Sequence, residues 1–449
     1  MIKTVSESYR NVLQKVILLK QNPTVKKYVL NTSWLFTEQV IRMSINLFVG
    51  VWVARFLGPG KFGTLNYAQS LVGLFGALAT LGLNNIVIRE LVKKIYDKNL
   101  LLGTAFFMKL FGGFVVLLFL IVAINIIPTD YYTKVIVMII ASSTVFQSFN
   151  VIDFYFQSRV ESKFVVYINF IVMIVSTLCK LIGLFFKAPL EFFAVITVIE
   201  SVVLALGLIY FYKKNREEIG QWKFSKVMCF ALLKDSWPLI LSSISISIGM
   251  RIDQVMLKSY MGETSVGYYA VGVKFAEIFN FIPMIISQSI FPKILQMDFS
   301  EERKKLINLI RYVFYFLVVL SIFVNILSSF SVNLLYGRTY LSSINVVNVL
   351  IWTIPFTYLN IVTNTILQKT NRNKIILYRQ LIIACVNIVF NLVLIPKYGI
   401  VGASISTLMA DVSLFFFGYL LKQERWIYFL RIESVLFFST QRFAKLNDK

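Results

Sequence analysis

The chain has 449 residues, of which 57% are hydrophobic, and it carries a formal net charge of +23. Together with a mean hydropathy of +0.74, this composition indicates a polytopic membrane protein. The sequence contains no histidine, which excludes a Ser-His-Asp triad and a histidine zinc site. Its three cysteines show neither metal-site spacing nor a disulfide framework, and no P-loop is present. We therefore expect no metal, no cofactor and no ATP hydrolysis.

Apolar stretches of about twenty residues recur along the whole chain. A hydrocarbon core of about 30 Å requires roughly 20 apolar residues per helix, and only helices or closed barrels satisfy their backbone there. The sequence therefore predicts an all-α polytopic membrane protein with twelve transmembrane helices. The predicted spans are 28–54, 64–88, 101–127, 135–157, 165–186, 192–212, 237–257, 268–290, 306–331, 342–366, 375–394 and 400–421.

Basic residues between these spans fall mainly on one side. Seven connections carry 31 Lys and Arg residues, whereas the six alternate connections carry 7. The basic set comprises 1–27, 89–100, 158–164, 213–236, 291–305, 367–374 and 422–449. By the positive-inside rule this set is cytoplasmic, so both termini are expected on the cytoplasmic side of the inner membrane. Basic residues spread over seven short loops suit a nucleic-acid partner poorly, and none is expected.

The two ends of the chain are expected to be cytoplasmic. Residues 1–27 lack the apolar core of a signal peptide, and their apolar residues recur at helical spacing. This pattern predicts an amphipathic segment on the inner leaflet. Residues 422–449 form a basic and aromatic tail that could lie there too. The alternative, a thirteenth span in the tail, would be short and charged.

The chain reads as two halves with the same plan, 28–212 and 237–421, joined by a cytoplasmic linker at 213–236. After the first span, Gly58 and Gly63 form a Gly-x4-Gly turn, and after the seventh span Gly262 and Gly267 do the same. A basic residue precedes each turn and Tyr-Ala follows it. The pattern predicts a duplication with a pseudo-two-fold axis along the membrane normal. We expect two six-helix lobes whose polar faces meet across a central cavity, with the linker serving as a length-tolerant tether.

Several charged residues lie inside the predicted spans, where a charge costs about 2.5–3.5 kcal/mol. Arg42 can pair with Glu38 one helical turn away. Arg251 and Asp253 diverge on one helix, so each requires another partner. The last pair, Lys274 and Glu277, can neutralise each other at a spacing of three residues, or both can serve function.

Other cations have a simpler interpretation. Lys180 and Lys187 lie near the outer end of span five and are expected to snorkel to the interface. Three more lie one to two turns from the cytoplasmic edge, where snorkelling competes with a functional role: Lys109, Arg311 and Arg379.

The remaining acids are candidates for an ion site. Asp153 lies near the inner end of span four, where it can pair with Arg159. Glu200 and Asp411 have no cation on their own helix at a spacing of three or four residues. The overall surplus inside the spans is cationic, which points to an anionic passenger such as a phosphate-bearing one.

Three segments carry a resemblance to a known family. They are Ala54-Arg55-Phe56-Leu57-Gly58-Pro59 with Gly63, Leu335-Tyr336-Gly337-Arg338-Thr339-Tyr340, and the run from Asn391 to Ser404 (NLVLIPKYGIVGAS). In these the chain resembles Wzx-type polysaccharide flippases, the polysaccharide-transport branch of the MOP superfamily. That superfamily also contains lipid II flippases and multidrug antiporters. The resemblance implies a MATE-like fold of twelve or fourteen helices, two lobes in a V, alternating access and no enzymatic activity.

The resemblance also implies a substrate and a site. The substrate would be a polyprenyl-pyrophosphate-linked oligosaccharide, such as an O-antigen (lipopolysaccharide) or capsule repeat unit, flipped to the outer leaflet. Other partners would be membrane lipids, a coupling Na⁺ or H⁺, and other polysaccharide-assembly membrane proteins. The pyrophosphate would bind Arg42, Arg251 and Lys274, with Arg311 as a weaker candidate. The candidates for ion coupling are Glu38, Asp253, Glu277 and Asp153.

Two other functions stay open at this point. A multidrug or cation antiporter of the same superfamily would require an acidic cavity, and here Arg and Lys compete with the acids. A membrane polysaccharide polymerase or ligase would require a sizeable external loop, whereas the predicted outer loops have at most about ten residues. For the flippase, Arg42→Ala and Arg251→Ala are each expected to abolish transport.

Overall fold

The computed structural model describes residues 23–127, 129–296, 302–370, 372–417 and 425–436. Every regular element in this part of the chain is a helix, so the predicted all-α polytopic class is confirmed. Most of the amphipathic segment predicted at 1–27 lies outside the described residues. So does the predicted tail at 422–449, except for one helix.

The described helices follow one another with short connections. In the first half they are α2 (Pro23–Ala79), α3 (Leu83–Lys93), α4 (Lys98–Ile126), α5 (Tyr131–Phe146), the 3₁₀ helix η1 (Gln147–Asn150), α6 (Val151–Ser158), α7 (Lys163–Phe185) and α8 (Leu190–Lys214). After η2 (Ile219–Gln221) come α9 (Lys226–Gln296), α10 (Arg303–Tyr336), η3 (Arg338–Tyr340), α11 (Ser343–Leu350), α12 (Thr353–Lys369), α13 (Asn373–Phe417) and α14 (Arg425–Leu436). Among the described residues, nine helical stretches are long and apolar enough to cross a membrane.

Three of the long helices, α2, α9 and α13, are each two helices joined at a bend. The 57 residues of α2 would make a straight helix of roughly 85 Å, nearly three hydrocarbon cores. The bend glycines have positive φ angles: 68° at Gly58, 79° at Gly262 and 58° at Gly399. Residues with a side chain rarely adopt this backbone conformation, so glycine permits each bend. Two of the three bends occur in the Gly-x4-Gly turns that the sequence predicts.

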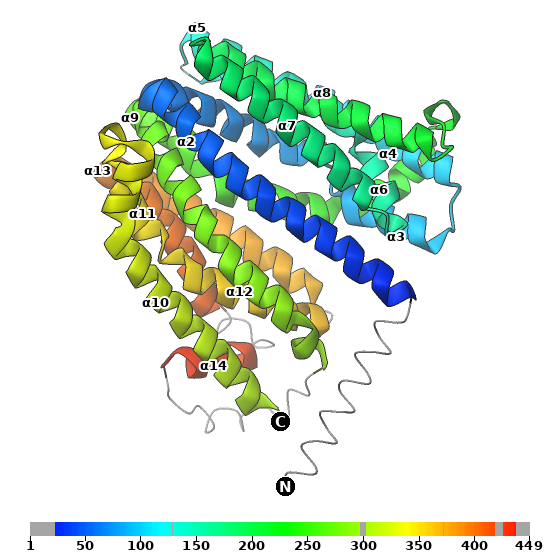
Figure 1. Ribbon diagram of the computed structural model, residues 1–449. Coiled ribbons are helices and arrows are strands. Elements are labelled where there is room, and N and C mark those ends of the chain that lie inside the picture. Colours follow the sequence, from blue (N-terminus) through cyan, green and yellow to red (C-terminus); the bar gives the residue numbers. More distant parts are fainter. Residues whose placement is uncertain (1–22, 128, 297–301, 371, 418–424, 437–449) are drawn as a thin grey trace.

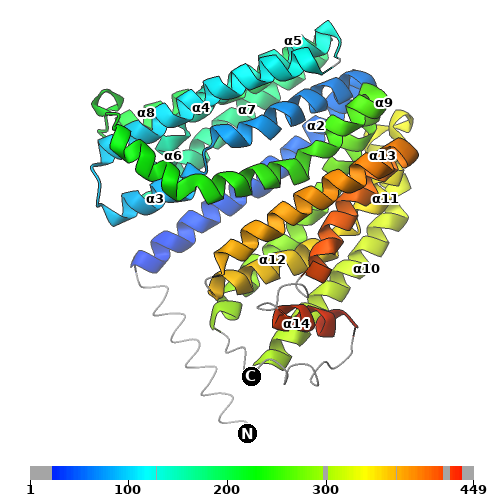
Figure 2. The ribbon, with the colours of Figure 1, turned by 180° about the vertical axis from the view of Figure 1, so that it is seen from behind.

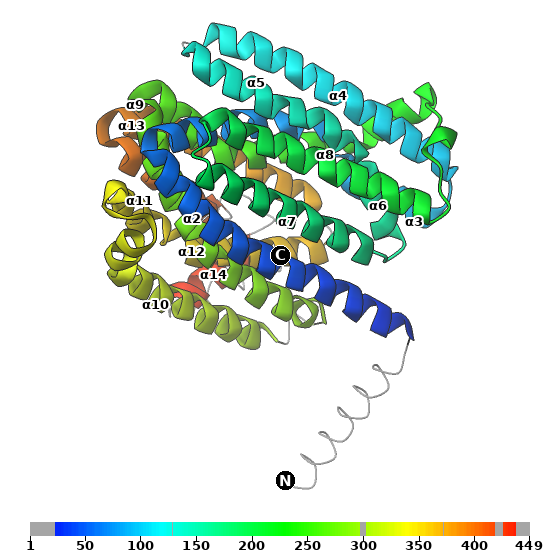
Figure 3. The ribbon, with the colours of Figure 1, turned by 45° about the horizontal axis from the view of Figure 1, so that its top comes forward.

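The helices form two groups on either side of α2 and α9. In Figure 1 the group of α4, α5, α7 and α8 lies at the top and the group of α10 to α14 at the lower left. The two groups converge at the corner where α2 and α9 bend, and their ribbons diverge toward the ends at which α2 and α10 begin; Figure 2 shows the same from behind. With the top turned forward, α4, α5, α7 and α8 form a layer of their own (Figure 3).

At the corner where α2 and α9 bend, the two halves pack backbone against backbone. A Cβ atom at Gly63 would lie 1.8 Å from the carbonyl oxygen of Glu263. A Cβ atom at Gly267 would lie 2.0 Å from the carbonyl oxygen of Pro59. Each glycine comes five residues after its own bend glycine and meets the residue that directly follows the other bend. The contact is therefore reciprocal, with the same position of each half meeting the same position of the other.

The linker between the halves packs onto the first half. The indole of Trp222 lies against the ring of Phe106 on α4 and donates a hydrogen bond to the hydroxyl of Tyr212 at 3.2 Å. Nearby, a Cβ atom at Gly103 would lie 2.5 Å from the carbonyl oxygen of Lys223, so α4 and the linker backbone are in close contact.

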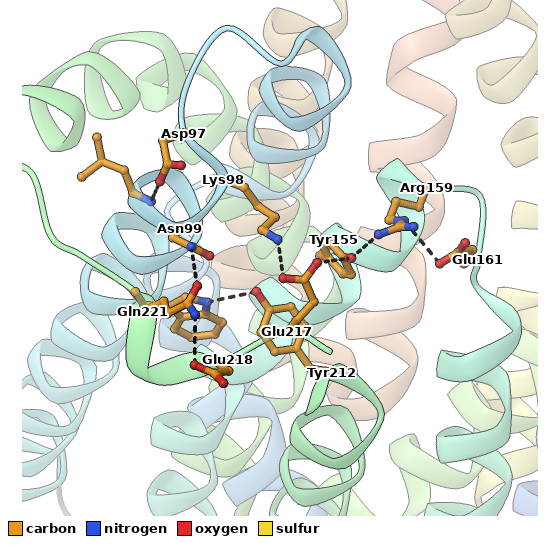
Figure 4. Close-up of polar contacts among 12 residues, drawn as sticks. Asp97, Lys98, Asn99, Tyr155, Arg159, Glu161, Tyr212, Glu217, Glu218 and Gln221 are labelled. Carbon is orange, nitrogen blue, oxygen red and sulfur yellow. Dashed lines mark hydrogen bonds and ion pairs between the residues drawn. The ribbon is translucent and has the colours of Figure 1, made fainter. Parts of the chain in front are cut away.

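Polar side chains hold the linker in the same place (Figure 4). Glu217 forms an ion pair with Lys98 at the start of α4 and accepts a hydrogen bond from Tyr155 at 2.8 Å. Arg159 in turn donates to the hydroxyl of Tyr155 at 2.5 Å, and Asn99 donates to Gln221 at 3.1 Å. The linker is therefore docked on the first half, and this packing argues against the predicted tolerance of changes in its length.

Helix α14 packs against α10. Its 12 residues are too few to cross a hydrocarbon core of about 30 Å. Arg303 forms an ion pair with Glu433 at 2.8 Å, and Tyr315 donates a hydrogen bond to the carbonyl oxygen of Val435 at 2.5 Å. The described part of the tail is thus a helix held against α10, and it is not a thirteenth span.

Candidate functional site

Asp253 on α9 is buried in the second half of the chain, with 3% of the residue exposed. Its Oδ2 atom accepts hydrogen bonds from the hydroxyls of Tyr269 and Thr407, each at 2.7 Å. Its Oδ1 atom accepts from the amide of Asn391 at 2.5 Å, and Asn391 also donates to Asn387 at 3.0 Å. Within the described residues no Lys or Arg forms an ion pair with this carboxylate, so its charge faces only neutral polar groups.

A cavity of about 250 Å³ opens beside this carboxylate. Its lining includes Asp253, Glu277 and Asp411, and the hydroxyl of Thr357 lies 3.5 Å from Asp411. The residues that line it include three carboxylates and no Lys or Arg. This acidic cavity can attract a cation. Two of the acids predicted for ion coupling, Asp253 and Glu277, line it.

A second cavity, of about 380 Å³, lies between the two halves and contains Arg251. It is lined on one side by α2 and α5 and on the other by α9, and Arg251 is the charged residue in its lining. The guanidinium packs on Gly73, where a Cβ atom would lie 2.5 Å from the Cζ atom. One Nη1 hydrogen bond, to the carbonyl oxygen of Gln69, is long at 3.4 Å. Most of the hydrogen-bonding capacity of Arg251 is therefore left for a ligand.

The other predicted anion ligands do not gather at Arg251. The Nε of Arg42 lies 3.2 Å from Glu38, so the ion pair predicted within this helix is present. Lys274 lies over the ring of Phe62 at 4.6 Å, within electrostatic range of Glu277. Neither Arg42 nor Lys274 lines the cavity at Arg251.

Arg311 lies in a different part of the second half. Its guanidinium donates hydrogen bonds to the carbonyl oxygens of Glu433 at 2.5 Å and Ser434 at 3.3 Å. Both acceptors belong to α14, so the contacts of Arg311 hold the C-terminal helix against α10. The structure therefore separates Arg311 from the other three predicted cations.

Asp153 lines a third cavity, of about 240 Å³, within the first half. Its carboxylate accepts a hydrogen bond from Gln157 at 3.0 Å. The predicted pair with Arg159 is wrong, because Arg159 contacts Tyr155 and lies 3.5 Å from Glu161. Asp153 is therefore left facing a polar cavity in the first half.

Contacts between helices correct the snorkelling prediction for Lys180 and bear on Lys109, for which the sequence leaves both snorkelling and a functional role open. Lys180 forms an ion pair with Glu200 on α8 at 2.9 Å, which also gives Glu200 the cation that its own helix lacks. Lys109 is only 5% exposed, and its ammonium lies 4.9 Å from the centre of the Phe154 ring. It lies eleven residues into α4, roughly three turns from the start of the helix, so it does not reach the interface.

Sequence reasoning missed most of the neutral polar groups in these cavities. Asn387 and Asn391 are four residues apart on α13, a spacing that places them on one helix face, and this was the available signal. Thr407 follows the bend at Gly399, so only the fold brings it to Asp253.

Comparison with known proteins connects this fold to a family. Residues 28–298, more than half of the chain, match the family profile described as polysaccharide biosynthesis protein. The chain belongs to the polysaccharide biosynthesis protein family. A second profile, MatE, matches residues 238–393. The family resemblance drawn from the sequence is therefore confirmed at the level of this family.

Relatives and solved structures agree with this assignment. A Shigella flexneri protein named "Putative O-antigen transporter" is 24% identical over 385 residues, which cover 79% of this chain and 88% of that protein. A protein of the same name from Shigella dysenteriae is 25% identical over 261 residues, which cover 55% of this chain and 64% of that protein.

Among solved structures, the lipid II flippase MurJ in an inward closed conformation has a TM-score of 0.72 at 15% identity, covering 93% of this chain and 95% of that chain. An inward-facing multidrug resistance MATE family transporter has a TM-score of 0.64 at 13% identity, and the match covers 87% of this chain and 95% of that chain. At these identities the likeness establishes the fold alone, which is the MATE- and MurJ-like fold.

Proposed function

We propose that this family member moves a polyprenyl-diphosphate-linked oligosaccharide from the cytoplasmic to the outer leaflet by alternating access. The observation that carries the proposal is the cavity at Arg251, which lies between the halves and presents a guanidinium with few protein acceptors. A guanidinium binds phosphate oxygens through two parallel hydrogen bonds. The names of the Shigella relatives support a glycan as the group carried.

The proposed topology has twelve crossings in two six-helix lobes, 28–212 and 237–421, related by a pseudo-two-fold axis and arranged in a V. The three bends divide the long helices and support this number, and the reciprocal contact of Gly63 and Gly267 supports the axis. Both termini are placed in the cytoplasm by the charge asymmetry of the loops. Cysteine labelling at 60, 262 and 337 should report the outside; labelling from the inside at any of these would contradict this topology.

For the diphosphate we propose Arg251 as the main ligand. Lys274 and Arg42 are assigned peripheral roles, since each already has a partner: a ring and an acid for Lys274, and Glu38 for Arg42. Removing a guanidinium from water at this depth is costly, and a bound diphosphate would offset that cost. Arg311 is left out of the proposed site because it holds α14.

For energy coupling we propose the carboxylate of Asp253, with Na⁺ or H⁺ as the ion. Carboxylate, amide and hydroxyl oxygens are the ligands that hard cations prefer. Asn391 presents a buried Oδ1 atom without a hydrogen-bond donor, which a cation would satisfy. Glu277 and Asp411 would raise the local cation concentration in the acidic cavity. Glu38 and Asp153 are proposed to act outside this ion site.

A cation or multidrug antiporter is the second candidate function. The acidic cavity of the second half favours it, as does the MatE profile over residues 238–393. The cationic cavity between the halves disfavours it, because an organic cation would be repelled by Arg251.

Deletion of the gene tests the proposal. We expect polyprenyl-linked oligosaccharide to accumulate in the cytoplasmic leaflet and surface polysaccharide to be lost, with both restored by the wild-type gene and not by Arg251→Ala. Efflux of a cationic dye measured in the same strains separates the second candidate. Unchanged surface polysaccharide together with reduced dye efflux would favour the antiporter.

A further inference from the structure

Two helices of the first half are broken where they border the cavity of Asp153. Helix α2 ends at Ala79 and α3 begins at Leu83, and between them Leu81 and Gly82 have positive φ angles of 50° and 59°. On the facing side, the 3₁₀ helix η1 separates α5 from α6. Irregular backbone at membrane depth persists where it lines a polar cavity, and broken helices often form binding sites in transporters.

Lys109 presents a buried charge to this cavity. It lines the cavity from α4, it is 5% exposed, and its contact is with the ring of Phe154. The carboxylate of Asp153 in the same cavity lies within electrostatic range of the ammonium. Among the described residues, however, no acceptor forms a hydrogen bond or a direct ion pair with its three donors. Buried donors without acceptors are unfavourable, so a ligand oxygen in contact with the ammonium would stabilise it.

Carboxamides supply the rest of the polar lining. Asn84, Asn85, Gln147 and Asn150 border the cavity, and within the described part of the chain their side chains form no hydrogen bonds. A carboxamide donates and accepts at the same time, as does a sugar hydroxyl. Asp153 adds an acceptor on the same wall. This mixture of donors and acceptors suits a polyhydroxylated ligand better than it suits a bare anion.

The cavity adjoins that of Arg251, since Thr80 and Gln147 line both. Its volume of about 240 Å³ equals roughly eight water molecules at about 30 Å³ each, enough for one sugar ring and too little for a chain of them. In the lipid-linked substrate the first sugar is bonded directly to the diphosphate. We infer that this cavity binds that first sugar, with Lys109 and the carboxamides contacting its hydroxyls. The inference rests on the proposed function, which places the diphosphate at Arg251.

Binding of two lipids to the full-length protein in nanodiscs tests the inference. The probes are undecaprenyl diphosphate, which has no sugar, and the lipid-linked oligosaccharide extracted from cells lacking the gene. We expect Lys109→Met to weaken binding of the extracted glycolipid by about tenfold or more, and Asn85→Ala by about threefold. The affinity for undecaprenyl diphosphate should change less than about twofold in both variants. In contrast, Arg251→Ala should weaken the binding of both lipids.

Matched controls lie outside the cavity. Lys163→Met removes a lysine that also lies over a ring, that of Phe164, and Asn125→Ala removes an asparagine from the other end of α4. Neither should alter binding of either lipid. If Lys109→Met and Asn85→Ala leave glycolipid binding intact while Arg251→Ala weakens it, the inference is wrong and the proposed function stands. If Lys109→Met weakened the binding of both lipids equally, the cavity would bind phosphate and the inference would be wrong. Failure of the wild type to bind either lipid would reject the proposed function itself.

Discussion

The cavity of the second half and the cavity between the two halves differ in the sign of their charge. The former is lined by three carboxylates and no basic residue, whereas Arg251 is the charged residue of the latter. The third cavity, in the first half, contains one charge of each sign, Lys109 and Asp153. The sequence shows only a cationic surplus within the spans, and the fold sorts the two signs into separate places. The two cavities are neighbours, because Ile246 lines both and Glu277 of the acidic cavity lies within electrostatic range of Arg251.

The separation assigns a task to each region. In the proposed function, substrate contacts would fall on the first half and on the seam between the halves, and ion contacts would fall on the second half. Because α9 contributes both Arg251 and Asp253, two residues apart and facing different cavities, one helix connects the two tasks. A change in ion occupancy that moved α9 would move Arg251 with it.

The largest effect is expected at Arg251. Replacing it with alanine should reduce flipping by about a hundredfold or more, since a buried charge-assisted contact to phosphate is lost. Arg251→Lys should keep partial activity, because an ammonium supplies charge without the bidentate geometry. Flipping of lipid-linked oligosaccharide in proteoliposomes measures this, with the exposed Arg338→Ala as the control. Wild-type rates in Arg251→Ala would place the anion site elsewhere.

The contact that joins the two regions is expected to be nearly as sensitive. Gly63→Ala would place a Cβ atom 1.8 Å from the carbonyl oxygen of Glu263 and should force the corner apart. Cysteine accessibility at the outer turns should increase and transport should fall at least about tenfold. Gly60→Ala is the matched control, since its Cβ atom would meet Thr264 at an ordinary 3.7 Å. The reciprocal contact would be irrelevant to gating if both variants behaved alike.

Asp253→Asn separates the ion site from the substrate site. We expect transport to fall about tenfold and to lose its dependence on a Na⁺ or proton gradient, because the carboxylate charge is removed. Binding of undecaprenyl diphosphate should be unchanged, since Asp253 does not line the cavity at Arg251. Asp411 makes only a long contact with Thr357 among the described residues, so Asp411→Asn should have the smaller effect on transport. If Asp253→Asn also lost lipid binding, Asp253 would contribute to the substrate site, and the two sites would not be separate.

The docked linker predicts an effect on stability. Trp222 is 9% exposed, so Trp222→Ala should lower the free energy of unfolding by about 3 kcal/mol by leaving a cavity among aromatic rings. The half-exposed Trp237, with 57% of the residue exposed, is the control, and its replacement by alanine should change stability little. Thermal unfolding in detergent compares the two. Equal melting temperatures for Trp222→Ala and the wild type would mean that the linker is only a tether.

The smallest effect is expected at Arg42. Its side chain is 49% exposed and its ion pair with Glu38 is of the kind that contributes under about 1 kcal/mol. Arg42→Ala should therefore reduce flipping by less than about threefold, in contrast to the loss that the sequence alone predicts. The same proteoliposome assay decides between the small effect expected from the structure and the loss of transport predicted from the sequence. If Arg42→Ala reduced flipping as much as Arg251→Ala does, Arg42 would be a main ligand of the anion site.

The sequence by itself determines the membrane class, the family and the places where the chain turns. These features are local: apolar length sets a span, and glycine at Gly58 and Gly262 permits a positive φ. The Arg42–Glu38 pair was also predictable, because both residues lie on one helix at a spacing of four.

Only the tertiary structure decides which charges meet across helices. Lys180 forms an ion pair with Glu200 on the next helix, and Arg311 donates hydrogen bonds to carbonyl oxygens more than a hundred residues away. Helical periodicity specifies which face a residue occupies and leaves open which helix covers that face. The cavities depend on this packing, because their walls come from helices distant in the sequence. That is why the sequence supplies the charged residues, whereas the fold decides which of them share a cavity.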